Sequence, residues 1–275
     1  MLPLVFSHAN SFPAATYRLL FALLRERGCE PRAVESFGHD PNYPVSNNWP
    51  HLVQQLADFS AEQVAESGRA AFLVGHSLGG FLSLMCAALH PQLGGKPVRG
   101  VLLLDSPLLG GWKAAALSVA KRAKLVGSVS PGAISRKRKT QWLDKNQVFE
   151  HFRSKKAFAS WHPDVLRDYI EHGTHDAPLD AAGQRLLSFD RDVETAIYNT
   201  LPHNLDQLVR QHPPACPVTF IGGLRSVEMK QVGMALTNKV TQGRQMMLDG
   251  GHLFPMEKPL ATAAAIEAAL LNMTA

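Results

Sequence analysis

The stretch Val74-Gly75-His76-Ser77-Leu78-Gly79-Gly80 decides the fold, because it joins a predicted strand directly to a predicted helix. The apolar run at 70–74 is typical of a short buried strand, and residues 78–89 are typical of a helix. Ser77 lies between them at the centre of a Gly-x-Ser-x-Gly pattern, the signature of a nucleophile elbow. Its glycines leave room for close backbone contacts around a strained turn. The alternative is a glycine-rich turn in which the serine only caps the helix.

Length and composition are those of a large globular protein. The chain has 275 residues, of which 45% are hydrophobic and 19% charged. Its apolar runs are too short for a membrane helix, and its first residues do not resemble a signal peptide. Cys29, Cys86 and Cys216 are widely spaced, which favours reduced thiols over a disulfide framework or a zinc site. We therefore expect a cytoplasmic protein without an integral membrane segment, a metal or another cofactor.

Strands alternate with helices along most of the chain, which predicts an α/β fold with a doubly wound, largely parallel sheet. Ligands of such a sheet bind at the carboxyl ends of its strands. Further helices are predicted over 227–236 and 259–271. The predicted strands cover residues 2–7, 30–37, 70–74, 98–104, 217–221 and 244–248.

Residues 108–205 interrupt this alternation, because they read as several helices with Gly and Pro breaks, one of them over 163–172. We therefore predict a core domain formed by residues 1–107 and 206–275, with residues 108–205 inserted as a helical lid.

Basic residues are concentrated in the predicted lid. Residues 113–156 hold twelve Lys or Arg and only two Asp or Glu, against a net charge of +5 for the whole chain. Such a surface could attract an anionic substrate, although a solvated basic face is the plainer alternative. No nucleic-acid recognition motif accompanies the charge, so no nucleic-acid partner is expected.

The chain resembles the α/β-hydrolase superfamily over nearly its full length. The motifs that carry the resemblance are His8-Ala9-Asn10 after the first strand, Gly75-His76-Ser77-Leu78-Gly79 at the elbow, and Gly250-Gly251-His252 after the last strand. The resemblance implies a sheet of about six strands, because the first two strands of many family members have no counterpart here. It says little about the substrate.

The resemblance also implies that Ser77 is a nucleophile and His252 its general base. A serine hydroxyl is a poor nucleophile at neutral pH and needs an adjacent base. Negative charge on the substrate's carbonyl oxygen requires N–H donors. We expect them to be the backbone N–H groups of Leu78 and Asn10, with Ser11 as the second choice for the latter.

The acid that orients His252 is less evident. Family members commonly carry Asp a few residues after the strand that ends here at Ile221, where this chain has Ser226. Other members carry the acid after the strand that ends here in Asp105, and Asp105 is the acid we predict. Glu228 is the second candidate, and a dyad without an acid is the third. Ser226 could orient the imidazole but carries no charge to stabilise its protonated form.

The sequence thus predicts a serine hydrolase that cleaves a carboxylic ester or thioester through an acyl-enzyme on Ser77. An acyltransferase or amidase of the same fold is an alternative within the enzymes. A non-catalytic small-molecule-binding protein is the alternative outside them. Serine at the elbow argues against dehalogenase and epoxide hydrolase chemistry, which use aspartate there. The substrate's identity and the oligomeric state are not predicted.

Overall fold

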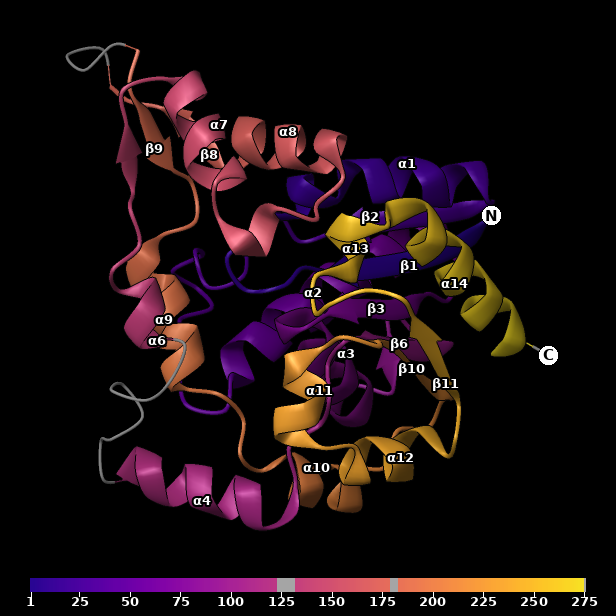
Figure 1. Cartoon of the computed structure of the whole chain (residues 1–275). Helices are drawn as coiled ribbons and strands as arrows, with labels where there is room; N and C mark the ends of the chain where they lie inside the picture. The colour runs from indigo at the N-terminus through magenta and orange to yellow at the C-terminus, as the bar shows by residue number, and fades with distance from the viewer. Residues whose placement is uncertain (123–131, 179–182, 275) are drawn as a thin grey trace.

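A six-stranded sheet runs through the middle of the molecule (Figure 1). The computed structural model describes residues 1–122, 132–178 and 183–274. The strands lie in the order β11-β10-β6-β3-β1-β2, and each neighbouring pair is parallel. This confirms the predicted doubly wound sheet. Its strands are β1 (Leu2–Ser7), β2 (Cys29–Ala33), β3 (Phe72–His76), β6 (Gly100–Leu104), β10 (Val218–Gly223) and β11 (Gln245–Leu248).

Helices cover both faces of the sheet, so successive strand residues are buried on opposite sides. Val5 packs in the apolar core on the side of α2 and α3, whereas Leu4 and Phe6 pack on the side of α1 and α14 (Figure 1). These four helices are α1 (Arg18–Glu26), α2 (Pro50–Ser67), α3 (Leu78–Leu89) and α14 (Pro259–Asn272).

Shorter elements complete this part of the chain. The single helix predicted over 227–236 is two helices, because Gly233 interrupts it with a φ of +82°. The shorter elements are η1 (Ala14–Tyr17), β4 (Gln92–Leu93), β5 (Lys96–Pro97), α10 (Leu205–Gln211), α11 (Val227–Val232), α12 (Ala235–Thr241) and α13 (Phe254–Glu257).

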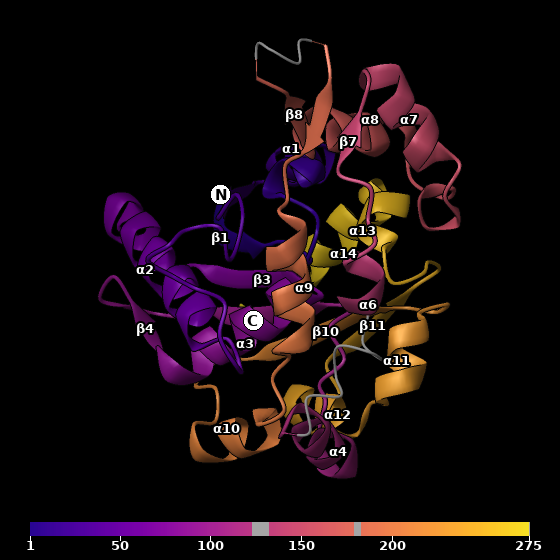
Figure 2. The same ribbon diagram turned by 90° about the vertical axis from the view of Figure 1, so that its left-hand side faces the viewer.

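Residues 108–205 form most of the connection between β6 and β10 and lie along the carboxyl ends of the sheet strands (Figures 1 and 2). Within this 108–205 segment, residues 123–131 and 179–182 lie outside the described part of the chain. In Figure 2, α6 and α9 stand in front of the sheet. The helices of the segment are α4 (Gly111–Arg122), α6 (Gly132–Ser135), α7 (Lys145–Arg153), η2 (Lys156–Phe158), α8 (Pro163–His172) and α9 (Arg191–Asn199).

The 108–205 segment also contains a small antiparallel sheet that the sequence did not predict. Its strands are β7 (Gln141–Trp142), β8 (Thr174–Asp176) and β9 (Arg185–Leu187), in the order β7-β9-β8. Strands of two or three residues are too short to show an alternating pattern. A buried Arg185 guanidinium holds two of them together, donating to the Asp176 carboxylate and to the Thr174 carbonyl, each over 2.6 Å.

An aromatic cluster attaches this segment to the core. Phe12, from the loop after β1, packs against Phe158, Trp161 and Tyr169 with ring centroids 5.4–6.3 Å apart. These aromatic side chains therefore form core packing between the segment and the sheet domain.

The described helices include none that is both long enough and apolar enough to cross a membrane. Cys29, Cys86 and Cys216 are free thiols.

Glycines allow α3 to pack directly on the sheet. A Cβ atom at Gly79 would lie 1.9 Å from the carbonyl oxygen of Ser7 on β1, and one at Gly75 would lie 2.1 Å from the backbone of Gly79. Neither neighbour is a flexible side chain. The approach of the elbow to the sheet therefore requires glycine at both positions.

We predict that Gly79→Ala lowers the free energy of unfolding by at least about 3 kcal/mol, because the new methyl group would clash with backbone. The matched control is Gly28→Ala. A Cβ atom there meets nothing within 4 Å, and only the φ of +75° opposes it, at about 1–2 kcal/mol. Urea denaturation measures both losses, and equal losses would contradict the close packing.

Candidate active site

Ser77 lies at the sharp turn between β3 and α3. Its φ of +53° and ψ of −113° are strained for a residue with a side chain. The Ser77 N–H donates to the Leu104 carbonyl over 3.0 Å, which fixes the turn to the neighbouring strand β6. The side chain remains partly exposed while most of its neighbours are buried. The local geometry is thus that of the elbow predicted from the glycine pattern.

Three predicted residues meet at the carboxyl ends of the sheet strands. His252, in the loop after β11, has Nε2 3.0 Å from the Ser77 Oγ and Nδ1 2.7 Å from an Asp105 carboxylate oxygen. Asp105 follows β6, which lies next to β3. The imidazole therefore bridges a hydroxyl and a carboxylate, which is the arrangement needed to withdraw a proton from serine.

Asp105 is fully buried and receives several hydrogen bonds. The backbone N–H of Gly223 donates to one carboxylate oxygen over 2.8 Å. The Ser226 hydroxyl donates to the other over 2.6 Å, and His252 Nδ1 lies against the same oxygen. A buried carboxylate requires such partners. Ser226, where the family commonly has its acid, thus donates to the carboxylate of Asp105.

Glu228, the second candidate acid, lies farther from the imidazole. Its carboxylate oxygen is 3.8 Å from His252 Nδ1, and its side chain is 43% exposed. It also lies 3.3 Å from the Ser226 hydroxyl, whose shorter contact is with Asp105. At this distance Glu228 contributes negative charge, whereas Asp105 makes the direct contact with the ring.

The charges around His252 determine its pKa. Burial of the imidazole lowers this pKa, but the hydrogen bond with Asp105 and the negative charges of Glu228 and Asp105 raise it. The raising effects are larger, so the pKa of His252 lies above its ordinary value. The same Asp105, Glu228 and His252 could offer metal-ligand atoms within 4.8 Å of one another. A metal there would have to replace the hydrogen bond between His252 and Asp105.

His76, beside Ser77, connects the site to the loop after β1. Its Nε2 lies 2.9 Å from the His252 carbonyl oxygen and so donates to it. Its Nδ1 therefore accepts from the Tyr17 hydroxyl, 2.8 Å away. That hydroxyl accepts from the Ala9 N–H over 3.1 Å. Burial lowers the pKa of His76 to about 3, so the ring is neutral.

His8 supports the same loop from the other side. Its Nδ1 donates to the Ala9 carbonyl, and its Nε2 accepts from the Phe37 N–H over 2.9 Å. Burial lowers the pKa of His8 to about 4. Both His8 and His76 therefore hydrogen-bond to backbone groups and have a structural role. Sequence reasoning did not find Tyr17 as the partner of His76, because 59 residues separate the two and no spacing rule connects them.

The loop after β1 places Asn10 next to Ser77. The Asn10 side chain donates to the Glu194 carbonyl over 3.1 Å, which fixes the loop to α9. Ser11 follows with a φ of +80°. Among the hydrogen bonds within the described residues, none is donated by the backbone N–H of Asn10 or of Leu78. Both N–H groups are thus without an acceptor among the described residues.

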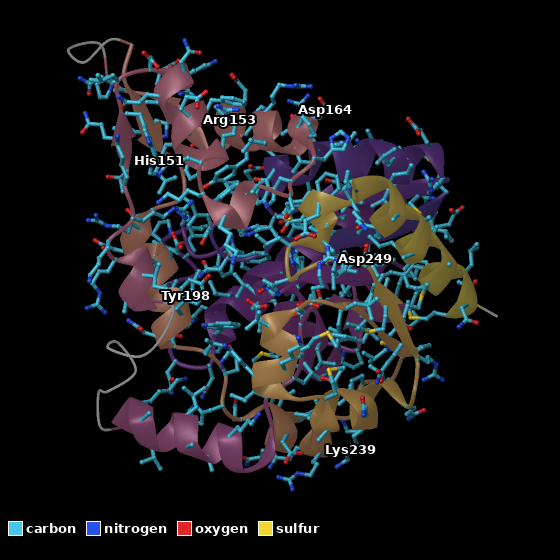
Figure 3. All side chains as sticks on the ribbon, viewed as in Figure 1. His151, Arg153, Asp164, Tyr198, Lys239 and Asp249 are labelled. Atoms are coloured by element: carbon cyan, nitrogen blue, oxygen red, sulfur yellow. The ribbon has the colours of Figure 1, made fainter. Side chains whose placement is uncertain are left out.

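Two cavities meet at Ser77. The smaller, of about 310 Å³, is lined mainly by apolar side chains, among them Trp49, Phe81 and Leu201. The larger, of about 1060 Å³, has many basic residues in its wall. Figure 3 labels His151 on α7 and Tyr198 on α9, two residues of the 108–205 segment that line the larger cavity. Tyr198 also lines the smaller one, and sequence reasoning missed it because no motif marks it.

Comparison with known proteins identifies the family of this chain. The family model described as "Alpha/beta hydrolase family" matches residues 4–265. No curated protein has a matching sequence. Among solved structures, E-2-(acetamidomethylene)succinate hydrolase has 23% identity and a TM-score of 0.69, covering 98% of this chain and 91% of its own.

Two other similar structures illustrate the range of enzymes with this fold. The thioesterase domain from the curacin biosynthetic pathway has 18% identity and a TM-score of 0.68, covering 98% of this chain and 91% of its own. Epoxide hydrolase A from Mycobacterium thermoresistibile has 15% identity and a TM-score of 0.65, covering 99% and 92%. At these identities the likeness shows the fold.

We predict that Tyr17→Phe lowers the free energy of unfolding by about 1–3 kcal/mol, because it leaves the buried Ala9 N–H and His76 Nδ1 without their partner. Tyr43→Phe is the control. The Tyr43 hydroxyl donates to Asp58 at a partly exposed position, so its loss is expected to stay within about 0.5 kcal/mol. Thermal and urea unfolding measure both variants. Equal losses of stability in Tyr17→Phe and Tyr43→Phe would contradict the prediction.

Proposed function

We propose that this chain, which belongs to the alpha/beta hydrolase family, is a serine hydrolase that cleaves a carboxylic ester or thioester. One observation carries the proposal. Ser77 Oγ, the His252 ring and the Asp105 carboxylate stand in series, with contacts of 3.0 and 2.7 Å, at the edge of two cavities. Epoxide hydrolases of this fold have aspartate at the elbow. This chain has Ser77 there, which supports acyl transfer instead.

In the first half-reaction Ser77 attacks the carbonyl carbon while His252 Nε2 accepts the hydroxyl proton. The carbonyl oxygen becomes an oxyanion, which the N–H groups of Leu78 and Asn10 would stabilise. The bond to the leaving alcohol or thiol then breaks, and His252 returns the proton to the leaving group. The acyl group stays on Ser77 as an ester.

In the second half-reaction a water molecule replaces the leaving group. His252 accepts a proton from this water, whose oxygen attacks the acyl carbon. The acyl–serine bond breaks, Ser77 recovers its proton from His252, and a carboxylic acid is released. Throughout, Asp105 holds the Nδ1–H tautomer of His252 and stabilises the imidazolium that forms.

The 108–205 segment supplies the cover of this site. Ile134 and Phe158 from the segment line the larger cavity together with Ser77 and His252. We therefore retain residues 108–205 as a lid on a core of residues 1–107 and 206–275. A lid excludes water from the acyl-enzyme and adds substrate contacts.

We predict that Ser77→Ala and His252→Ala each reduce kcat by at least about 10⁴-fold with p-nitrophenyl esters, because nucleophile and base act as one unit. The melting temperature should change little. A fluorophosphonate probe should label the wild type at Ser77 and leave Ser77→Ala unlabelled. Absence of labelling and turnover in the folded wild type would favour a non-catalytic binding protein.

We predict that Asp105→Asn reduces kcat by about 10⁴-fold, whereas Glu228→Gln stays within about tenfold of the wild type. The base must be neutral, so activity falls as the pH drops through the raised pKa of His252. Glu228→Gln removes one negative charge that raises this pKa. The acidic limb of its kcat/KM profile should therefore move to lower pH. If Glu228→Gln lost its activity while Asp105→Asn remained active, Glu228 rather than Asp105 would be the acid that orients His252.

A further inference from the structure

We propose that the substrate joins an apolar acyl group, bound in the smaller cavity, to a leaving group that carries phosphate and is bound in the larger one. The inference rests on the proposed function and adds the substrate class. Its starting point is the position of Ser77 and His252, which line both cavities. When a substrate bond is cleaved at Ser77, the acyl group can therefore occupy one cavity and the leaving group the other.

The smaller cavity suits an acyl chain. Its walls include Trp49, Phe81, Ile197, Leu201 and Val232. A volume of about 310 Å³ is at the low end of the range for whole small-molecule ligands, about 300–1,000 Å³. It is therefore a compartment for part of a substrate. A phosphate placed there would lose its hydration against apolar walls, which is strongly unfavourable.

The larger cavity has the opposite character. Six Lys or Arg residues line it, together with three Glu residues. Two of the glutamates pair with arginines, and the third lies near the imidazole of His252. Glu194 pairs with Arg138 over 2.6 Å, Glu257 lies 3.7 Å from Arg225, and Glu228 lies 3.8 Å from His252.

The remaining cations of the larger cavity are four lysines of the 108–205 segment. Lys137, Lys155 and Lys156 are exposed, and no carboxylate of the described residues lies within 4.0 Å of their ammonium groups. Lys139 contacts only neutral groups among the described residues, the Gln147 amide oxygen and the Trp142 ring. We call Lys137, Lys139, Lys155 and Lys156 the lysine wall.

The lysine wall distinguishes phosphate from other leaving groups. Uncompensated charges of one sign in a concave site concentrate the field and attract anions. A single carboxylate carries one negative charge, whereas a phosphate monoester carries about 1.5–2 and three acceptor oxygens. Four ammonium groups, each with three donors, match one or more phosphates. The volume of about 1060 Å³ leaves room for a leaving group of cofactor size.

The experiment compares thioesters of the same octanoyl chain. Octanoyl-coenzyme A carries phosphates, and octanoyl-N-acetylcysteamine is neutral. Between about 20 and 300 mM NaCl, kcat/KM should fall at least about tenfold for the first and change less than about twofold for the second. Octanoyl-lysophosphatidic acid, a lipid ester whose leaving group carries a phosphate monoester, is tested in parallel. The preferred phosphate substrate identifies a nucleotide-like or a lipid source.

The variant Lys137→Gln/Lys155→Gln/Lys156→Gln tests the lysine wall directly. It should lower kcat/KM at least about tenfold for the preferred phosphate substrate and leave the neutral thioester within about twofold. The matched control is Lys96→Gln/Lys230→Gln/Lys239→Gln, three exposed lysines outside both cavities. Lys239 lies on α12, far from His151 in Figure 3. The control should behave as the wild type with every substrate.

The outcomes separate this inference from the proposed function. If the neutral thioester is hydrolysed through Ser77 but neither phosphate substrate responds to salt or to the lysine variant, the lysine wall is only a solvated face and the inference is overturned. If Ser77 is neither labelled nor required for turnover, the proposed function fails first.

Discussion

The buried carboxylate of Asp105 constrains the whole site. A fully buried charge is tolerated only when hydrogen-bond donors surround it. Its donors come from Gly223 at the end of β10, from Ser226 beyond it, and from His252 after β11. The hydrogen bonds to this one carboxylate therefore bring together the ends of three neighbouring strands, β6, β10 and β11. The position of the imidazole is a consequence of this arrangement.

Two strained residues stand side by side at this edge of the sheet. Ser77 and Asp105 have φ values of +53° and +43° and follow the adjacent strands β3 and β6. Such conformations each cost about 1–3 kcal/mol and persist only where the surroundings impose them. Ser106 contacts both turns, because its hydroxyl lies 2.9 Å from the Ser77 carbonyl oxygen and 3.0 Å from the carbonyl oxygen of Leu104, the residue before Asp105. The proposed nucleophile and acid are thus linked through one side chain.

The sequence predicted those parts of the fold and the site that hydrophobic periodicity and local motifs encode. Most of the six main strands are apolar runs, and the elbow and the Gly250-Gly251-His252 loop are contiguous patterns, so these were readable. The exception is β2, which is not an apolar run and ends at Ala33, before the end of the strand predicted over 30–37. Asp105 was predicted because it stands at the end of the fourth predicted strand, after which some members of the family carry the acid. Ser226 was considered as an acid, and its role as a donor to Asp105 depends on a contact across 121 residues. The small sheet around Arg185 depends likewise on tertiary hydrogen bonds, which leave no local pattern.

The two histidines at the centre of the site show how environment separates chemical roles. The His76 and His252 rings lie 5.3 Å apart, yet their pKa values shift in opposite directions. Burial keeps His76 neutral, and its pKa is lowered further by the charge of His252. His252 instead has carboxylates that favour its protonated form. A protonated His76 would repel the imidazolium that catalysis requires on His252. The neutral state of His76 therefore favours the proposed role of His252 as a base, while the His76 N–H holds the His252 carbonyl in place.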